Sequence, residues 1–132
     1  MKLIDVGCAV IEKSGKMLVC QRKPGDVYGG WWEFPGGKKE FSETIEACLV
    51  REVFEELGVG IRPEHLLKIT AYVYPQKGVK LLFYRCRWLW GRPYRKDCYQ
   101  FAWLSPKELG QKKFLPADIE MINELIQRGA FL

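Results

Sequence analysis

The sequence predicts an α+β protein, an α/β/α sandwich in which β-strands are flanked by two or three helices. Several runs rich in β-branched and aromatic residues are separated by turns that contain glycine or proline, which indicates a sheet. Other stretches repeat apolar residues at helical spacing. With 132 residues, of which 48% are apolar, the chain suits a single domain over residues 1–132.

The first part of the chain predicts a hairpin followed by a long loop. Residues 3–11 are rich in valine, isoleucine and alanine and predict a strand. KSGK at residues 13–16 is a turn signal, and MLVCQR at residues 17–22 predicts the second strand. Residues 23–39 are rich in glycine and hold several aromatic side chains. A loop of this length inside a compact domain is usually functional.

A helix is predicted after this loop. Ser42 or Thr44 can serve as its N-cap, and Gly58 suits the position that follows its last turn. Apolar side chains recur every fourth residue, which predicts a face turned toward the core. These side chains are Ile45, Leu49, Val53 and Leu57.

The remainder of the chain predicts three strands, at Ile69–Tyr74, Leu81–Trp90 and Tyr99–Trp103. A short helix then begins after Ser105, because SPKEL has the pattern of a capping box with proline at the first helical position. A last helix, ending at Gly129, is predicted from one apolar stripe. The stripe consists of Ile119, Ile122, Leu125 and Ile126.

Charge and cysteine content limit the classes of function. The net charge of +5 and pI near 9.0 suit a polyanionic partner such as a phosphate ester or nucleic acid, and also lie within the normal range for solubility. An odd number of cysteines without CxxC argues against a disulfide framework or a zinc site. The single histidine cannot form a histidine-based metal site. With no apolar run near ~20 residues and no signal-peptide layout, we expect a cytoplasmic protein without a membrane segment.

The stretch REVFEELGV concentrates negative charge in a basic protein. Glu52, Glu55 and Glu56 lie at spacing that places them on one helical face, where like charges cost about 0.2–0.5 kcal/mol per pair. Magnesium and manganese prefer carboxylate oxygens as ligands, and a cation would remove the repulsion. The spacing therefore predicts a divalent metal site on this helix.

The glutamates belong to a longer pattern. It reads Gly37, five residues, Glu43, seven residues, Arg51, Glu52, an aliphatic residue, any residue, Glu55, Glu56, any residue, Gly58 and an aliphatic residue. This is the Nudix box, and the sequence resembles Nudix hydrolases, in particular the MutT-like group. WEFPGGK at residues 32–38, the tryptophan that closes the last strand and LPAD at residues 115–118 extend the resemblance over most of the chain.

The resemblance implies a mixed sheet between helices and an enzyme that hydrolyses (deoxy)nucleoside triphosphates. Water commonly attacks the β-phosphorus and releases a monophosphate and pyrophosphate. Modified substrates such as 8-oxo-dGTP or cytidine analogues would make the role sanitation of the nucleotide pool. One alternative is removal of pyrophosphate from RNA 5′-triphosphate ends. A non-catalytic ligand sensor is less favoured, because every box residue is present. Both a monomer and a homodimer remain open.

The resemblance also assigns the metal site. Glu52, Glu55 and Glu56 would hold Mg²⁺, or Mn²⁺, with the carbonyl of Gly36. Glu52 would orient or deprotonate the attacking water, and Arg51 would position the catalytic glutamates.

A further acidic residue is expected six positions before the strand tryptophan, where this chain has Asp97. Its side chain is shorter than the usual glutamate, and a solvated turn is the alternative interpretation. Three residues are expected at the substrate. Arg22 and Lys38 would meet phosphates and Phe34 would line the base pocket.

Asp118 occupies the position that contacts the base in MutT-like enzymes. An ionised aspartate only accepts hydrogen bonds, which suits the exocyclic amine of cytosine or adenine. A protonated Asp118, or a guanine-type ring with a suitable N–H, would also fit 8-oxoguanine. The alternative is that Asp118 caps the last helix.

Overall fold

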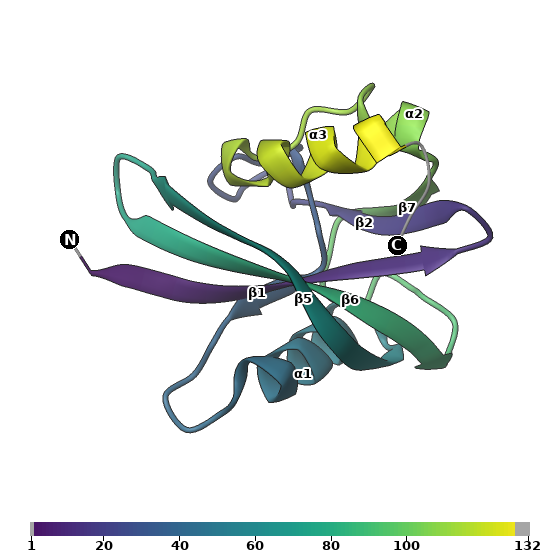
Figure 1. Cartoon of the computed structure of the whole chain (residues 1–132), viewed down its shortest axis with the longest axis horizontal. Helices are drawn as coiled ribbons and strands as arrows, with labels where there is room; N and C mark the ends of the chain where they lie inside the picture. The colour runs from purple at the N-terminus through teal and green to yellow at the C-terminus, as the bar shows by residue number, and fades with distance from the viewer. Residues whose placement is uncertain (1, 129–132) are drawn as a thin grey trace.

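The computed structural model describes residues 2–128, and its chain crosses a twisted sheet repeatedly (Figure 1). The elements are β1 Leu3–Lys13, β2 Lys16–Gln21, β3 Trp32–Glu33, β4 Gly36–Lys38, α1 Ile45–Leu57, β5 Gly60–Val73, β6 Gly78–Trp90, β7 Gln100–Leu104, α2 Pro106–Leu109, the 3₁₀ helix η1 Pro116–Asp118 and α3 Ile119–Arg128. No helix in the described range is long and apolar enough to cross a membrane.

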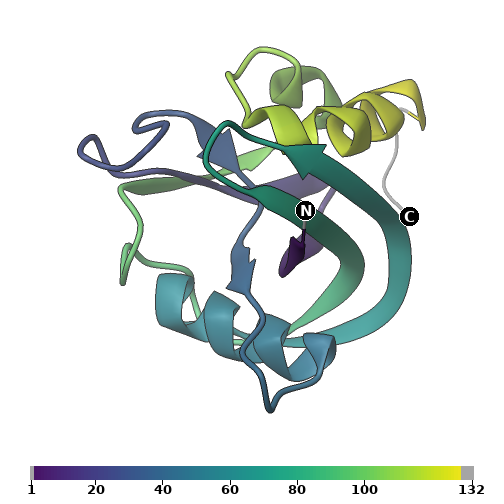
Figure 2. The same cartoon turned by 90° about the vertical axis from the view of Figure 1, so that its left-hand side faces the viewer.

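The sheet is mixed and is organised around β1. Its strand order is β3-β2-β1-β6-β5, with β4 also paired to β1 and β7 to β2. β1 runs parallel to β6 and antiparallel to β2 and β4. Figures 1 and 2 show α1 on one face and α2 and α3 on the other. The predicted α+β sandwich is confirmed.

Alternation along β1 fills two separate cores, because successive side chains of a strand point to opposite faces. Cys8 and Val10 belong to the core beneath α3, together with its buried side chains Met121, Ile122 and Leu125. Ala9 and Ile11 belong to the core beneath α1, with Leu49, Val53 and Leu57. The carboxyl end of α1 is thereby fixed against the sheet.

Several local features that the sequence predicts are present in the structure. Ser14 and Gly15 have φ of 54° and 78°, the left-handed values that a tight hairpin turn needs. Thr44 rather than Ser42 is the N-cap of α1, and it accepts a hydrogen bond from Ala47 N–H at 3.1 Å. Gly58 follows the helix with φ of 71°.

Two predictions about strands were incomplete. Residues 23–39 are not all loop, because β3 pairs with β2 and β4 pairs with β1. β3 has only two residues and β4 has two glycines among its three, so neither shows a strand pattern. β5 begins at Gly60, well before the predicted Ile69. Pro63 and the register shifts next to it interrupt the alternation that would have revealed the strand.

The predicted face of the last helix was partly wrong. Ile119 and Ile126 are 41% and 37% exposed, whereas Met121 is buried beside Ile122 and Leu125. η1 directly precedes α3. The predicted helix end at Gly129 lies outside the described residues. The capping box at Ser105 is confirmed, with side-chain and backbone bonds exchanged between Ser105 and Glu108.

Candidate active site

Arg51 is the centre of a carboxylate network at the middle of α1. Its Nη2 and Nε donate to the two oxygens of Glu43 at 2.6 and 3.0 Å, a bidentate contact. The hydrogen bonds from Arg51 lower the pKa of Glu43 to about 2. The sequence left open whether these two residues touch, and the chain preceding α1 folds back to bring them together.

The same guanidinium reaches two of the three predicted metal ligands. Arg51 Nη1 lies 2.7 Å from Glu52 Oε1 and 3.3 Å from Glu55 Oε2. Burial raises the pKa of Glu52, and its contact with Arg51 opposes this shift. Glu55 is more open, with 52% of its side chain exposed. Arg51 thus offsets part of the repulsion that the sequence implies, and it fixes the position of both carboxylates.

The third glutamate, Glu56, lies against β4. Gly36 N–H donates to Glu56 Oε1 at 2.8 Å. Gly36 has φ of 149°, where a side chain would also clash with the carbonyl of Gly7, and a Cβ on Gly37 would clash with the carboxylate of Glu52. The two glycines therefore allow the glycine-rich strand to approach the glutamate-bearing face of α1.

The chemistry of Glu52, Glu55 and Glu56 suits a hard divalent cation. All three are carboxylates, the preferred ligands of magnesium and manganese. Burial raises the pKa of Glu56 well above its ordinary value, and the charge of Glu33 adds to the effect. Positive charge beside Glu56 would favour its ionised form. Within residues 2–128, no three His, Cys, Asp or Glu side chains already converge on one point.

A cavity of about 620 Å³ opens beside the Glu56 end of this network. Its volume lies in the range of small-molecule sites. The wall includes residues from β1, β4, α1, the β2–β3 loop, the β5–β6 hairpin and η1. Of the predicted site residues it includes Arg22, Phe34, Gly36, Lys38, Glu56, Asp97 and Asp118. Arg51, Glu52 and Glu55 are not part of the wall.

The three predicted substrate residues have different surroundings. Arg22 donates to the carbonyl of Val27 at 2.8 Å and contacts Glu33 at 3.3 Å, so it holds the loop that forms one side of the cavity. Lys38 is exposed, and its carbonyl accepts from Arg51. Phe34 is only 3% exposed and packs mainly in the core, so it presents little surface to the cavity.

Asp97 lies at the same end of the cavity as Glu56. Its N–H donates to the carbonyl of Glu56 at 3.0 Å, and its carboxylate forms an ion pair with Lys23. The side chain is 64% exposed. Asp97 is therefore near the predicted metal ligands, in a solvated turn, and faces a cation from the opposite loop.

Asp118 lies in η1, in the wall of the same cavity, and is 2% exposed. Burial raises its pKa well above the ordinary 3.8, the charge of Glu33 adds to the shift, and the N–H of Phe34 opposes it. In the part of the chain that the structure describes, its Oδ2 has no hydrogen-bond partner. Asp118 is thus a buried carboxyl group with an unused oxygen in the wall of a cavity.

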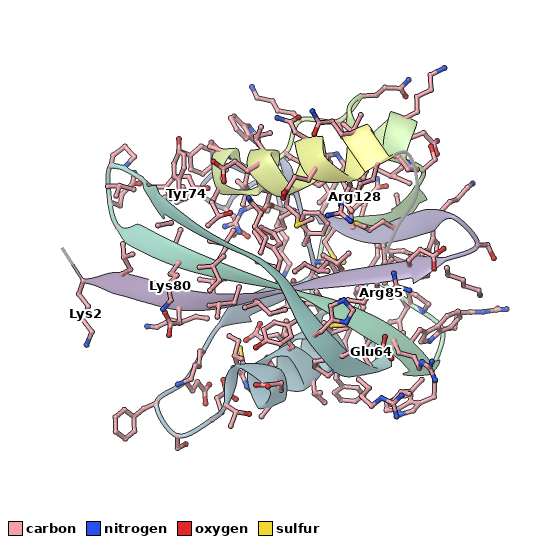
Figure 3. All side chains as sticks on the ribbon, viewed as in Figure 1. Lys2, Glu64, Tyr74, Lys80, Arg85 and Arg128 are labelled. Carbon is pink, nitrogen blue, oxygen red and sulfur yellow. The ribbon has the colours of Figure 1, made fainter. Side chains whose placement is uncertain are left out.

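Sequence reasoning missed Glu33 and Tyr74. Glu33 is a second carboxyl group in the cavity wall, partly exposed, and desolvation raises its pKa against the effect of Arg22. A charged residue between Trp32 and Phe34 was the available signal. Tyr74 accepts a hydrogen bond from Ala117 N–H at 3.1 Å through its hydroxyl, which ties η1 to the β5–β6 hairpin. Figure 3 shows Tyr74 beside the start of α3.

Comparisons with known proteins cover both the fold and the site. A family model described as NUDIX domain matches residues 1–125. The 8-oxo-dGTP diphosphatase of Haemophilus influenzae is 30% identical over 95% of this chain and 93% of that protein. The CTP pyrophosphohydrolase of Escherichia coli is 33% identical over 93% of this chain and 91% of that protein. The solution structure of the E. coli ORF135 protein has a TM-score of 0.82 at 31% identity, covering 97% of this chain and 91% of that one.

Proposed function

This chain belongs to the NUDIX domain family and is a Nudix hydrolase, and we propose that it cleaves (deoxy)nucleoside triphosphates to a monophosphate and pyrophosphate. The preferred substrates in this proposal carry modified bases, such as 8-oxo-dGTP or cytidine analogues, so that the enzyme sanitises the nucleotide pool. Similar proteins named 8-oxo-dGTP diphosphatase and CTP pyrophosphohydrolase support both substrate types.

The observation that carries this proposal is the layout of the cavity. Glu56 and Asp97 are neighbours in its wall, Glu33 and Asp118 line it as well, and Arg22 and Lys38 contribute positive charge. A nucleotide has a base at one end, which needs hydrogen-bonding groups, and a chain of phosphates at the other, which needs positive charge. Because the acidic network of α1 adjoins the cavity, the phosphates would lie at that end.

Nudix hydrolases generally need a divalent metal ion, and we propose Mg²⁺, with Mn²⁺ as a substitute, held by Glu52, Glu55 and Glu56. Such an ion neutralises phosphate charge and lowers the pKa of bound water. Glu52 would orient the water and accept its proton, a role that suits a carboxylate whose pKa is raised by burial. Arg51 would keep Glu52 and Glu55 in position through the contacts described above.

Asp118 and Glu33 would read the base. Burial favours the neutral form of both groups, and a neutral carboxyl offers one donor and one acceptor. Asp118 in that form can donate to a base carbonyl and accept from a ring N–H, as 8-oxoguanine presents. When ionised it can accept from the amine of cytosine. The protonation state of Asp118 therefore decides which arrangement of donors and acceptors on the base is bound.

A turnover panel tests this function directly. Purified protein with MgCl₂ would be given canonical and oxidised nucleoside triphosphates, NDP-sugars, dinucleoside polyphosphates and triphosphorylated RNA, with pyrophosphate and monophosphate measured separately. The proposal expects equal amounts of both products from a nucleoside triphosphate and the highest kcat/KM for a modified base. A preference for triphosphorylated RNA would replace it with the alternative function, and release of orthophosphate alone would contradict the reaction.

We also propose that residues 1–132 form a single hydrolase domain and that the protein acts in the cytoplasm, as a monomer or a homodimer. The five cysteines, all of which are free thiols, support a reducing compartment. Sedimentation velocity at micromolar concentration distinguishes the two oligomeric states.

A further inference from the structure

Three aromatic side chains near the carboxyl end of α1 remain about half exposed. Phe54, Trp90 and Tyr94 are 43%, 55% and 52% exposed, and the rings of Phe54 and Trp90 lie 6.0 Å apart at 63°. Side chains of this size contribute most to stability when they are buried. We refer to these three residues as the aromatic platform.

The rings of the platform are supported by backbone rather than suspended in solvent. Tyr94 lies so close to Gly58, and Trp90 so close to Gly60, that a Cβ on either glycine would clash with the ring. Tyr94 N–H also donates to the carbonyl of Leu57 at 3.1 Å. Each of these two rings therefore has one side held against the chain and surface left open on the other side.

Positive charge surrounds the platform. The loop at residues 91–99, which follows β6, carries Arg92, Arg95 and Lys96. Lys96 Nζ lies 4.0 Å from the centre of the Phe54 ring, a cation–π contact. Arg95 donates to the carbonyl of Tyr99 at 3.2 Å, which holds the loop in a fixed shape.

The acidic side chains nearest in sequence to the platform also contact cations. Glu55 follows Phe54 on α1 and contacts Arg51 at 3.3 Å, a cation that it shares with Glu43 and Glu52. Asp97 lies in the basic loop and is paired with Lys23. The charges of Arg92 and Lys96 are therefore only weakly offset, and the surface favours a polyanion.

The platform is separate from the proposed catalytic cavity. None of its three residues belongs to the cavity wall, although Asp97 and Cys98 of the neighbouring loop do. Successive residues of a helix are turned by about 100°, which places Phe54 on the flank of α1 opposite to Glu52. A ligand of the platform therefore need not occupy the cavity.

We propose that the aromatic platform and the basic side chains Arg92 and Lys96 beside it bind single-stranded nucleic acid. Unpaired bases would stack on the open surfaces of Trp90 and Tyr94, and Arg92 and Lys96 would contact the phosphates. Stacking surfaces combined with cations are the features that hold single strands without reading their sequence. A duplex hides the faces of its bases, so it would use only the charges. This inference is independent of the proposed reaction.

Fluorescence anisotropy with a short fluorescein-labelled oligouridylate, at low salt and without divalent metal, tests the proposal. Wild-type protein should bind, and Trp90→Ala or Tyr94→Ala should each weaken binding by roughly 5- to 100-fold. Trp90→Phe should retain most of the affinity. Replacing Arg92 and Lys96 together with glutamine should reduce the slope of log K against log salt by about 0.7 for each lost contact.

Val73→Ala is the matched control, because Val73 is an apolar side chain, 60% exposed, on a different strand. It should leave binding unchanged. Thermal unfolding of each variant identifies one that fails to fold, and in that case Trp90→Phe and the double glutamine variant decide. Absence of binding by the wild type, equal binding by the alanine variants, or equal affinity for a duplex of the same length would overturn the proposal. Nucleotide turnover in the platform variants should stay within about twofold of the wild type.

Discussion

Beside the cavity, Glu43 and Glu52 share the guanidinium of Arg51, whereas in the cavity wall Asp118 is buried with an oxygen that has no partner in the described residues. The same chemical group thus occurs in two opposite environments. Ion pairing lowers the pKa of Glu43 to about 2, and burial raises the pKa of Asp118.

The contrast separates two tasks. A paired carboxylate stays ionised and keeps a fixed position, which suits a network that supports metal ligands. A buried carboxyl without a cation keeps its proton more readily, which gives it both a donor and an acceptor. Hydrolysis would depend on the first kind of group and choice of base on the second.

The largest effect is expected from Glu52→Gln. The amide keeps the shape of the side chain and removes its ability to accept a proton, so pyrophosphate release should fall by about 10²- to 10⁴-fold. Glu46→Gln, in the first turn of the same helix, is the control and should stay within about twofold. Persistent turnover by Glu52→Gln would remove this residue from the catalytic role.

A smaller loss is expected from Arg51→Lys. A lysine cannot make the bidentate contact with Glu43 while also reaching Glu52, so the position of the glutamates should become less defined. We expect kcat to fall by about 10- to 100-fold with a smaller change in KM, as for other residues that orient ligands. Arg87→Lys, at an exposed side chain of β6, is the control, and a change in KM alone would argue against positioning.

The proposed contact with the base is tested by Asp118→Asn. The substitution keeps the shape but fixes one donor group and one acceptor, so the ratio of kcat/KM for cytidine and 8-oxoguanine nucleotides should change by about tenfold or more. Steady-state kinetics on both substrates measures the ratio. A uniform loss on both, together with a lower melting temperature, would favour the helix-cap interpretation.

The smallest effects concern stability, and they should have opposite signs. The folded protein holds the Asp118 proton that the unfolded chain releases above about pH 3.8. Wild-type stability should therefore decrease relative to Asp118→Asn as pH rises above that value, by at most about 1.4 kcal/mol per pH unit. For Glu43, the stability advantage over Glu43→Gln should grow as pH rises from about 2 to 4.5 and then remain constant.

Denaturant unfolding of the wild type and both variants, in the same buffers at a series of pH values, measures the two differences in unfolding free energy. Each variant is then a control for the other. If both differences change with pH in the same direction, the two carboxyl groups do not differ in the way the structure implies.

The predictions from sequence succeeded where neighbouring residues determine the structure. Thr44, Gly58 and the capping box at Ser105 lie within one or two turns of the helix ends they terminate, so their patterns can be read directly. They failed where pairing is distant. β3 and β4 form only because β2 and β1 are available as partners, and β5 has an irregular register that hides its alternation.

The sequence by itself determined the family resemblance, the sandwich fold and the glutamate-bearing helix, because helical spacing places Glu52, Glu55 and Glu56 on one side whatever surrounds them. Only the tertiary structure decided that Glu33 and Asp118, far apart along the chain, line the same cavity. It also decided which carboxyl groups are paired with a cation and which are buried. Burial and charge contacts arise from packing between distant segments, and for this reason the pKa of each carboxyl group could not be read from the sequence.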